Sequence, residues 1–175
     1  MCKARGEALD CDPVSTSSPV LRPATAADLP AVLALIRALA DFEKLPGPDE
    51  AAAARFTSDF AANPPRFELL VATLDAEVVA YALHFQAYST FLARPSLYLE
   101  DLFVRPDVRS RGIGRSLLQR LAKIAAERGC GRFEWTVLDW NVNAQAFYRS
   151  VGAHILTEWQ VCRVDGERLA ALSEG

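Results

Sequence analysis

Apolar positions along the chain follow two patterns, one with helical spacing and one of short continuous runs. Helical spacing covers residues 29–39 and 113–124, whereas apolar runs cover residues 67–73, 78–85 and 97–104. An amphipathic helix repeats every 3.6 residues, while a buried strand is short and nearly continuous. The chain is therefore predicted to mix helices and strands in an α/β fold.

Shorter signals complete the predicted order of elements, β-α-α-β-β-β-α-β-α-β. Thr25-x-x-Asp28 is a variant of the capping box that begins a helix, and Gly129 is a candidate to end one. The remaining elements are strands at residues 20–22 and 132–137, helices at 49–60 and 143–150, and closing strands at 155–164 with a turn at Asp165-Gly166.

The segment Arg109-Ser-Arg-Gly-Ile-Gly114 joins the apolar run 97–104 to the helical pattern that follows. Two glycines let the backbone approach a ligand closely, and the first turn of a helix offers unpaired N–H groups and the positive end of a dipole. Arg109, Arg111 and Arg115 add forked donors suited to phosphate oxygens. This arrangement predicts a site for an anion such as a pyrophosphate.

The distribution of charge and the loop sequence narrow the range of ligands expected at this loop. Seven basic residues and two acidic ones lie between Arg105 and Arg128, although the whole chain has a net charge of −3. No aromatic residues interleave with these bases, so no nucleic-acid surface is expected. A dinucleotide fingerprint requires glycine where Leu117 stands, and a P-loop requires lysine where Arg115 stands. A Gly-x-Gly pair that only ends a strand and begins a helix remains the alternative.

The remaining composition excludes some classes of site. The four cysteines, Cys2, Cys11, Cys130 and Cys162, show no Cys-x-x-Cys spacing, and the chain has only two histidines, so neither a metal site nor a disulfide is expected. The most apolar window, residues 29–40, is interrupted by Arg37 and too short to cross a membrane. With no targeting segment recognisable in residues 1–19, a cytoplasmic protein without membrane contact is predicted.

Several motifs occur together in an order that resembles a known family. Arg109-x-x-Gly112-x-Gly114 resembles the acetyl-CoA loop of the GCN5-related N-acetyltransferases, the GNAT superfamily. Four further segments look like its diamine acetyltransferase branch, which includes spermidine/spermine and thialysine acetyltransferases: residues 21–28, 98–101, 137–141 and 147–153. The resemblance covers about residues 19–175, so these are taken as one N-acetyltransferase domain, preceded by a flexible extension at residues 1–18.

The resemblance implies a single GNAT-like domain, with a mixed and mostly antiparallel sheet flanked by helices and a strand that splays at the coenzyme site. It also implies acetyl-CoA as co-substrate. No serine or cysteine lies in a recognisable nucleophile-plus-base pattern, so direct attack by an amine within a ternary complex is the simpler route. That route needs a deprotonated amine, a polarised carbonyl and a neutralised thiolate.

Two residues are candidates for the proton transfers. Tyr148 matches the family tyrosine that points at the coenzyme sulfur, and a phenol with a pKa near 10 stays protonated at neutral pH; read alone, it would be a packing tyrosine. Glu100 and Asp101 are adjacent acids in an apolar strand, and a bulge is needed to bring both to one pocket. Glu100 is the first choice to bind the substrate ammonium and help to remove its proton; its alternative is an edge-strand charge.

The resemblance also implies the residues that contact each ligand. Those implied for the coenzyme are Leu102, Phe103, Val104, Arg109, Ser110, Arg111, Gly112, Ile113, Gly114, Arg115, Asn141 and Tyr148. Those implied for the acceptor amine are Phe42, Glu43, Glu100, Asp101, Glu134, Trp135 and Thr136. Asn141 has a helix N-cap as its simpler role, and the two roles are compatible.

The sequence limits the class of acceptor amine but does not identify the acceptor. Residues 88–95 hold no acid where polyamine enzymes are expected to have one, so spermine is disfavoured. A small primary amine with a distant positive or zwitterionic group, such as a thialysine- or lysine-like amino acid or a diamine, is preferred. A protein lysine or N-terminal acetyltransferase, an aminoglycoside acceptor and a non-catalytic acyl-CoA binding module stay open. The resemblance further implies a homodimer, with residues 155–164 as a strand for partner contact.

Overall fold

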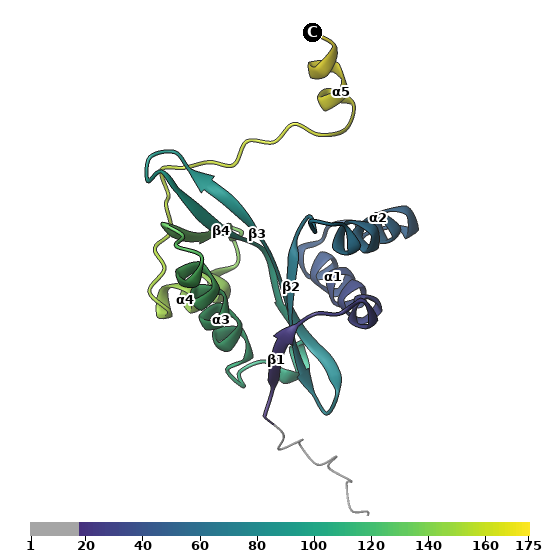
Figure 1. The fold of residues 1–175 in the computed structure, drawn as a ribbon, viewed down its shortest axis with the longest axis vertical. Coiled ribbons are helices and arrows are strands. Elements are labelled where there is room, and N and C mark those ends of the chain that lie inside the picture. Colours follow the sequence, from purple (N-terminus) through teal and green to yellow (C-terminus); the bar gives the residue numbers. More distant parts are fainter. Residues whose placement is uncertain (1–17) are drawn as a thin grey trace, which may run out of the picture. The chain divides into compact units, whose positions relative to one another are not determined.

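The computed structural model describes residues 18–175, so residues 1–17 of the predicted extension lie outside the described part. The chain divides into two compact units, one ending at Thr136 and the other running from Val137 to Gly175. The first unit holds a five-stranded sheet in the order β1-β2-β3-β4-β5 (Figure 1). Its strands are β1 (Val20–Pro23), β2 (Glu68–Leu74), β3 (Glu77–Ser89), β4 (Arg94–Val104) and β5 (Arg132–Trp135).

Neighbouring strands are antiparallel except for the parallel pair β4 and β5. The predicted mixed, mostly antiparallel sheet is thus confirmed. The long antiparallel pair β3 and β4 forms the centre of the unit: β3 is buried on both faces over residues 79–84, and β4 buries Ser96, Leu97, Leu99 and Phe103.

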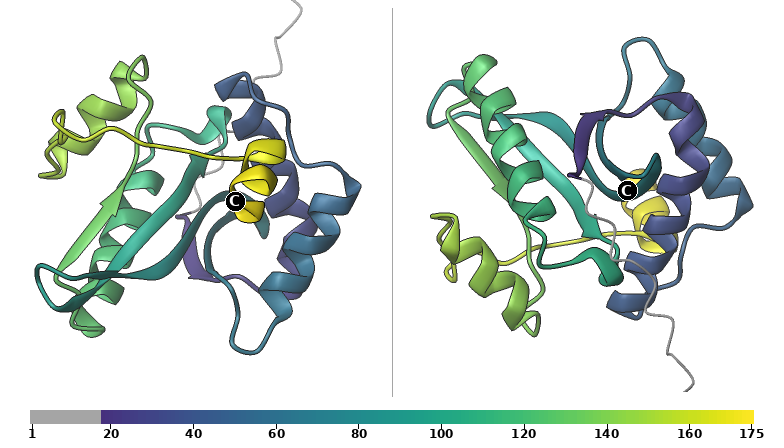
Figure 2. Two further views of the ribbon diagram at one scale, coloured as in Figure 1. Left: turned by 90° about the horizontal axis from the view of Figure 1, so that it is seen from above. Right: turned by 90° about the horizontal axis from the view of Figure 1, so that it is seen from below.

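Helices cover both faces of this sheet (Figures 1 and 2). On one face lie α1 (Leu29–Glu43) and α2 (Glu50–Ala61), and on the other lies α3 (Ile113–Glu127). The core under α1 joins the helix residues Leu29, Val32 and Leu35 to Tyr81 and Leu83 of β3 and Phe103 of β4. On the opposite face α3 buries Leu117 and Leu121 completely. Each such leucine stabilises the fold by roughly 1.5–3 kcal/mol relative to an exposed one.

The predicted capping box is present. It lies at the start of a 3-10 turn, η1 (Ala26–Asp28), which leads directly into α1. The Asp28 carboxylate accepts hydrogen bonds from the Thr25 backbone N–H at 2.7 Å and the Thr25 hydroxyl at 2.8 Å. Arg22 donates to both carboxylate oxygens, at 2.7 and 2.8 Å. This guanidinium holds the pKa of the buried Asp28 well below its usual range.

The bulge predicted at the adjacent acids is present in β4. Leu83 pairs with Asp101 and the next residue, His84, pairs with Leu99, so Glu100 has no partner on β3. On its other side β4 pairs with β5 only at residues 96–99. The pairing with β5, which ends at Trp135, therefore stops just before the bulge and leaves the edge of Asp101–Val104 that faces away from β3 unpaired by β5.

The second unit contains α4 (Val142–Ser150) and α5 (Gly166–Glu174). The predicted closing strands at residues 155–164 are wrong, because the structure assigns no strand to them. The predicted turn at Asp165-Gly166 is instead the start of α5, with Asp165 as its N-cap. The segment has the apolar residues of a strand, but a strand forms only where a neighbour completes its backbone hydrogen bonds, and the described residues pair no strand with this segment.

Candidate active site

The coenzyme loop predicted from the sequence connects β4 to α3 through a 3-10 turn, η2 (Pro106–Val108). Ser110 and Gly112 both have positive φ angles, 65° and 79°, and Gly112 is the N-cap of α3. A Cβ added at Gly112 would meet nothing within 4 Å, so the space beside the helix end is open. The bond from the Ser116 N–H to the Gly112 carbonyl is 3.0 Å long, and the N–H groups ahead of it point out of the helix end.

Arg109 turns back toward β4. Its Nε donates to the Val104 carbonyl at 2.9 Å, and its guanidinium lies 5.5 Å from the ring centre of Phe103 and 5.7 Å from that of Phe42. The contact with Phe42 joins the loop to the last turn of α1, a link that sequence reasoning did not predict. Arg109 therefore has a bridging role in addition to any contact with an anion.

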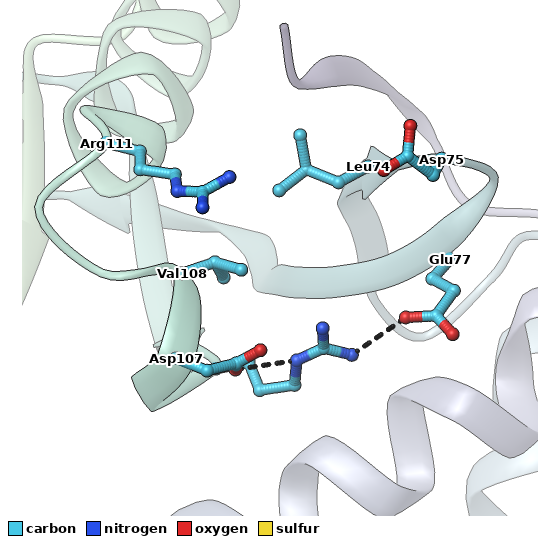
Figure 3. A pocket seen from close by; sticks show the side chains of 7 residues that line it. Leu74, Asp75, Glu77, Asp107, Val108 and Arg111 are labelled. Carbon is cyan, nitrogen blue, oxygen red and sulfur yellow. Dashed lines mark hydrogen bonds and ion pairs between the residues drawn. The ribbon is translucent and has the colours of Figure 1, made fainter. Parts of the chain in front are cut away.

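Arg111 lines a shallow hollow of about 380 Å³ beside the same loop (Figure 3). The other residues that line this hollow are Leu74, Asp75, Glu77, Arg105, Asp107 and Val108. Arg105 donates to Asp107 at 2.8 Å and to Glu77 at 3.1 Å, and it lowers the pKa of Asp107. Much of the positive charge that the sequence places at residue 105 is therefore balanced locally by carboxylates.

An acid cluster, defined here as Glu43, Glu100 and Asp101 with Tyr81, is centred on Asp101, which lies on the side of the sheet that α1 covers; the Glu100 side chain is exposed at the bulge. Asp101 pairs with Leu83, whose side chain belongs to the core under α1. The Tyr81 hydroxyl donates to Asp101 Oδ2 at 3.1 Å. Glu43 is the last residue of α1, and its charge helps to raise the pKa of both Tyr81 and Asp101. Two of the other acids that sequence reasoning assigned to the acceptor, Glu43 and Glu100, thus lie near enough to raise the pKa of Asp101.

Burial governs the ionisation of this cluster. It raises the pKa of Asp101 to about 6, an effect that the Tyr81 hydrogen bond opposes and the charges of Glu100 and Glu43 reinforce. Burial also raises the pKa of Glu43, and burial together with the Asp101 charge raises the pKa of Tyr81. A cation placed among these carboxylates would relieve their repulsion, so the arrangement is suited to bind an ammonium group.

Sequence reasoning missed Tyr81. The available signal was a tyrosine within the apolar run 78–85, because a buried hydroxyl normally finds a hydrogen-bond partner. Its partner could not be named, since the contact depends on the register between β3 and β4.

Strand β5 runs alongside β4 just before the bulge and carries the remaining acceptor candidates of this unit. Glu134 pairs with Tyr98 and Trp135 with Leu99, and Thr136 follows the end of the strand. Glu134 forms an ion pair with Arg132, whose Nε lies 3.0 Å from Glu134 Oε2, and the ring centres of Trp135 and Phe133 are 4.8 Å apart. These side chains are partly buried, apart from the exposed Thr136.

Asn141 and Tyr148 belong to the second unit. Asn141 is the N-cap of α4, and its side-chain oxygen accepts from the Ala144 N–H at 3.2 Å, so its simpler predicted role is confirmed. Tyr148 is partly buried in the last turn of α4, with its ring 5.4 Å from that of Phe147.

Other features of residues 18–175 bear on ligands. No three His, Cys, Asp or Glu side chains in this range gather so that they could hold a metal ion. Cys130 is a free, partly buried thiol and Cys162 a free, exposed one. None of the helices described is long and apolar enough to cross a membrane.

Comparison with known proteins gives a consistent result. The sequence profile described as "Acetyltransferase (GNAT) family" matches residues 33–153. A thialysine N-epsilon-acetyltransferase from Sus scrofa is 34% identical over 168 residues, which cover 90% of this chain and 98% of that protein. An L-ornithine N5-acetyltransferase from Arabidopsis thaliana is 43% identical over 113 residues, but this match covers only 64% of the chain and half of the plant protein.

Solved structures agree in fold. The integron cassette protein VCH_CASS6 from V. cholerae has 25% identity and a TM-score of 0.78, with 91% of this chain and 99% of that chain covered. An aminoglycoside acetyltransferase from an uncultured soil metagenomic sample has a TM-score of 0.67 at 21% identity, covering 85% of this chain and 95% of that one. The predicted fold class is therefore confirmed.

Proposed function

Because the chain belongs to the GNAT family of acetyltransferases, as its motifs predicted, we propose that it moves an acetyl group from acetyl-CoA to a primary amine of a small molecule. The acceptor we favour carries a second charged group, as thialysine, lysine, ornithine and diamines do. The observation that carries this proposal is the acid cluster around Asp101, a residue of the strand β4 that leads into the coenzyme loop. Relatives named as thialysine and ornithine acetyltransferases support the acceptor class.

The coenzyme would be held by two features of the first unit. The open space at Gly112, the N-terminus of α3 and the neighbouring Arg115 suit its pyrophosphate. The β4 residues Leu102–Val104 lie beyond the end of the β5 pairing, so their outward backbone groups, apart from the Val104 carbonyl that accepts from Arg109, suit an extended pantetheine arm. Acetyl-CoA supplies the thioester whose acetyl group is transferred.

The acceptor ammonium would be received by the acid cluster, where Glu100 remains the first choice to help remove its proton. The bulge supports this role, because it leaves Glu100 without a partner on β3 while the Glu100 charge still raises the pKa of Asp101. Glu43 approaches from α1 and suits the second positive group of a diamine or amino acid. A deprotonated amine can then attack the thioester carbonyl.

Tyr148 is proposed to donate a proton to the leaving thiolate, and Asn141 to contact the coenzyme from the start of the same helix. The proposal for Tyr148 rests on its place in the segment Phe147–Ala153 and on the chemistry of a phenol, which is protonated at neutral pH.

We also propose that the protein is a homodimer. In the second unit, eight large apolar side chains are exposed: Trp140, Val142, Leu156, Trp159, Val161, Val164, Leu169 and Leu172. Exposed apolar side chains at this density are typical of a surface that another chain covers. The cytoplasmic location remains a prediction from the sequence.

An amine panel tests the proposed activity. Thialysine, lysine, ornithine, putrescine, spermidine, an aminoglycoside, a lysine-containing peptide and a peptide with a free N-terminus are incubated with acetyl-CoA, and released CoA is measured with a thiol reagent. We expect turnover with the small diamino compounds and at most weak turnover with both peptides. Preference for a peptide would overturn the acceptor class. Acetyl-CoA binding by calorimetry without turnover of any amine would indicate a binding module.

A further inference from the structure

Tyr81 is a fully buried tyrosine whose hydroxyl reaches the acid cluster from the core. Its relative exposure is 0%, and its ring packs with Leu83, Phe103 and Val32 under α1. Tyr81 pairs with Phe103 and Leu83 pairs with Asp101, so the bond from Tyr81 to Asp101 runs diagonally between neighbouring pairs of β3 and β4. Diagonal neighbours on one sheet face are within reach of a tyrosine side chain.

We propose that Tyr81 is a positioning residue, whose hydroxyl holds the Asp101 carboxylate in one orientation for the acceptor ammonium. The inference rests on the proposed function for its consequence in the reaction, but the contact itself does not. A ring packed on all sides cannot rotate freely, so its hydroxyl is a fixed donor. The Asp101 carboxylate, which accepts this hydrogen bond, loses rotational freedom before any amine binds. Less entropy is then lost when an amine binds to the carboxylate.

The surrounding charges give this hydrogen bond a second effect. The groups that act on Asp101 are Glu43 from α1, Tyr81 from β3 and its neighbour Glu100 on β4, while the nearby guanidinium of Arg109 stacks on Phe103. Burial and both glutamates favour the protonated form of Asp101, whereas the Tyr81 hydroxyl favours the ionised form. By lowering the pKa of Asp101, the Tyr81 hydroxyl keeps this carboxylate ionised at near-neutral pH, where it can bind an ammonium ion.

Tyr81→Phe removes this donor and keeps the ring. The side-chain carboxyl signal of Asp101, assigned with Asp101→Asn, is titrated by carbon-detected NMR in the full chain without any amine. We expect the titration midpoint to rise by about one pH unit in Tyr81→Phe, since a hydrogen bond to a charged group shifts protonation by tenfold or more. Tyr98→Phe, which removes a hydroxyl from β4 itself, is the matched control and should leave the midpoint in place. An unchanged midpoint in Tyr81→Phe would overturn the proposal.

The consequence for the reaction is measured separately. With an amine that the wild type acetylates, the acidic limb of kcat/KM against pH should move upward in Tyr81→Phe together with the NMR midpoint, and the amine KM should rise more than kcat falls. An NMR shift without any movement of this limb would show that Asp101 is not positioned for the acceptor. Absence of turnover by the wild type would instead count against the proposed function, and the titration would still decide the contact.

A second variant covers the case in which Tyr81→Phe does not fold. Tyr81→3-fluorotyrosine, introduced at this position alone, keeps both ring and hydroxyl but makes the hydroxyl a stronger donor. The midpoint of Asp101 should then move downward, and an upward or absent shift would contradict the proposal.

Discussion

At the scale of single residues, two aspartates show how surroundings decide what a carboxylate does. Asp28 is buried, but Arg22 and Thr25 donate four hydrogen bonds to it, and its pKa falls. Asp101 receives one hydrogen bond, from Tyr81, and burial raises its pKa to about 6. Asp28 is therefore saturated and stabilises the fold, whereas Asp101 retains capacity for a ligand.

Asp28→Asn should destabilise the protein by about 2 kcal/mol at pH 7, because charged hydrogen bonds are lost from a buried site. A folded-state pKa below the unfolded value contributes stability above the unfolded pKa, and this contribution disappears as the pH falls below about 4. The difference between wild type and variant in urea unfolding should therefore shrink in acid. Asp49→Asn is the control: this exposed N-cap accepts from Ala52 at 2.7 Å, and asparagine caps equally well. Equal losses in both variants would contradict the explanation.

Tyr148→Phe should lower kcat by about 100- to 10,000-fold, the usual range for a general acid. The affinity for acetyl-CoA should stay nearly unchanged, because the hydroxyl is needed chiefly while charge develops on the sulfur. Single-turnover kinetics with a good amine would report the chemical step directly. A wild-type rate in that experiment would assign the acid role to another group or to water.

At the scale of elements, the junction of β4 and α3 combines a bulge, a strand edge that β5 does not pair and a helix N-terminus within residues 100–113. Each feature has a local cause. The bulge accommodates two adjacent acids, and the positive φ angle of Gly112 is one that most L-residues avoid. The proposed sites for acceptor and coenzyme thus follow one another along a single segment of the first unit.

The charge at this helix end can be tested with a pair of isosteric variants. Both Gly112→Asp and Gly112→Asn add a side chain to open space, and both residues tolerate a positive φ better than most. Only the aspartate adds negative charge, so its Kd for acetyl-CoA should be about tenfold higher, or roughly 1.4 kcal/mol. Calorimetry at two salt concentrations checks this, since the difference should decrease at high ionic strength. Equal affinities would exclude this helix end as the pyrophosphate site.

At the scale of the whole molecule, the two units differ in how they are stabilised. The first has a core on both faces of its sheet, whereas no residue of α4 or α5 is fully buried. A segment that exposes large apolar side chains gains stability when another surface covers them. A second copy of the chain is the partner we propose.

Sedimentation velocity at micromolar concentration should show a dimer for the wild type. Trp159→Glu should weaken this dimer strongly, because it places a charge among the exposed apolar residues of the second unit. Val20→Glu makes the same kind of change at an exposed position of β1 and should leave the mass unchanged. A monomeric wild type would remove the dimer proposal.

Local features were predictable from the amino-acid sequence because their causes lie within a few residues. The spacing in α1 and α3, the Thr25–Asp28 capping box and the Gly-rich loop all depend on neighbours in the chain. The need for a bulge at Glu100 followed from two acids in an apolar run. Schellman-type bonds at the end of α3, from Gly129 to Ala126 and from Cys130 to Ala125, likewise follow from one glycine.

Features that join distant segments were decided only by the tertiary structure. The bond from Tyr81 to Asp101 requires the register of β3 against β4, and the contact of Arg109 with Phe42 requires α1 to end beside the coenzyme loop. The strands expected at residues 155–164 failed for the same reason. An apolar pattern states that a segment can form a strand, but the hydrogen bonds that make it one must come from a neighbouring chain segment, and no short stretch of sequence specifies that neighbour.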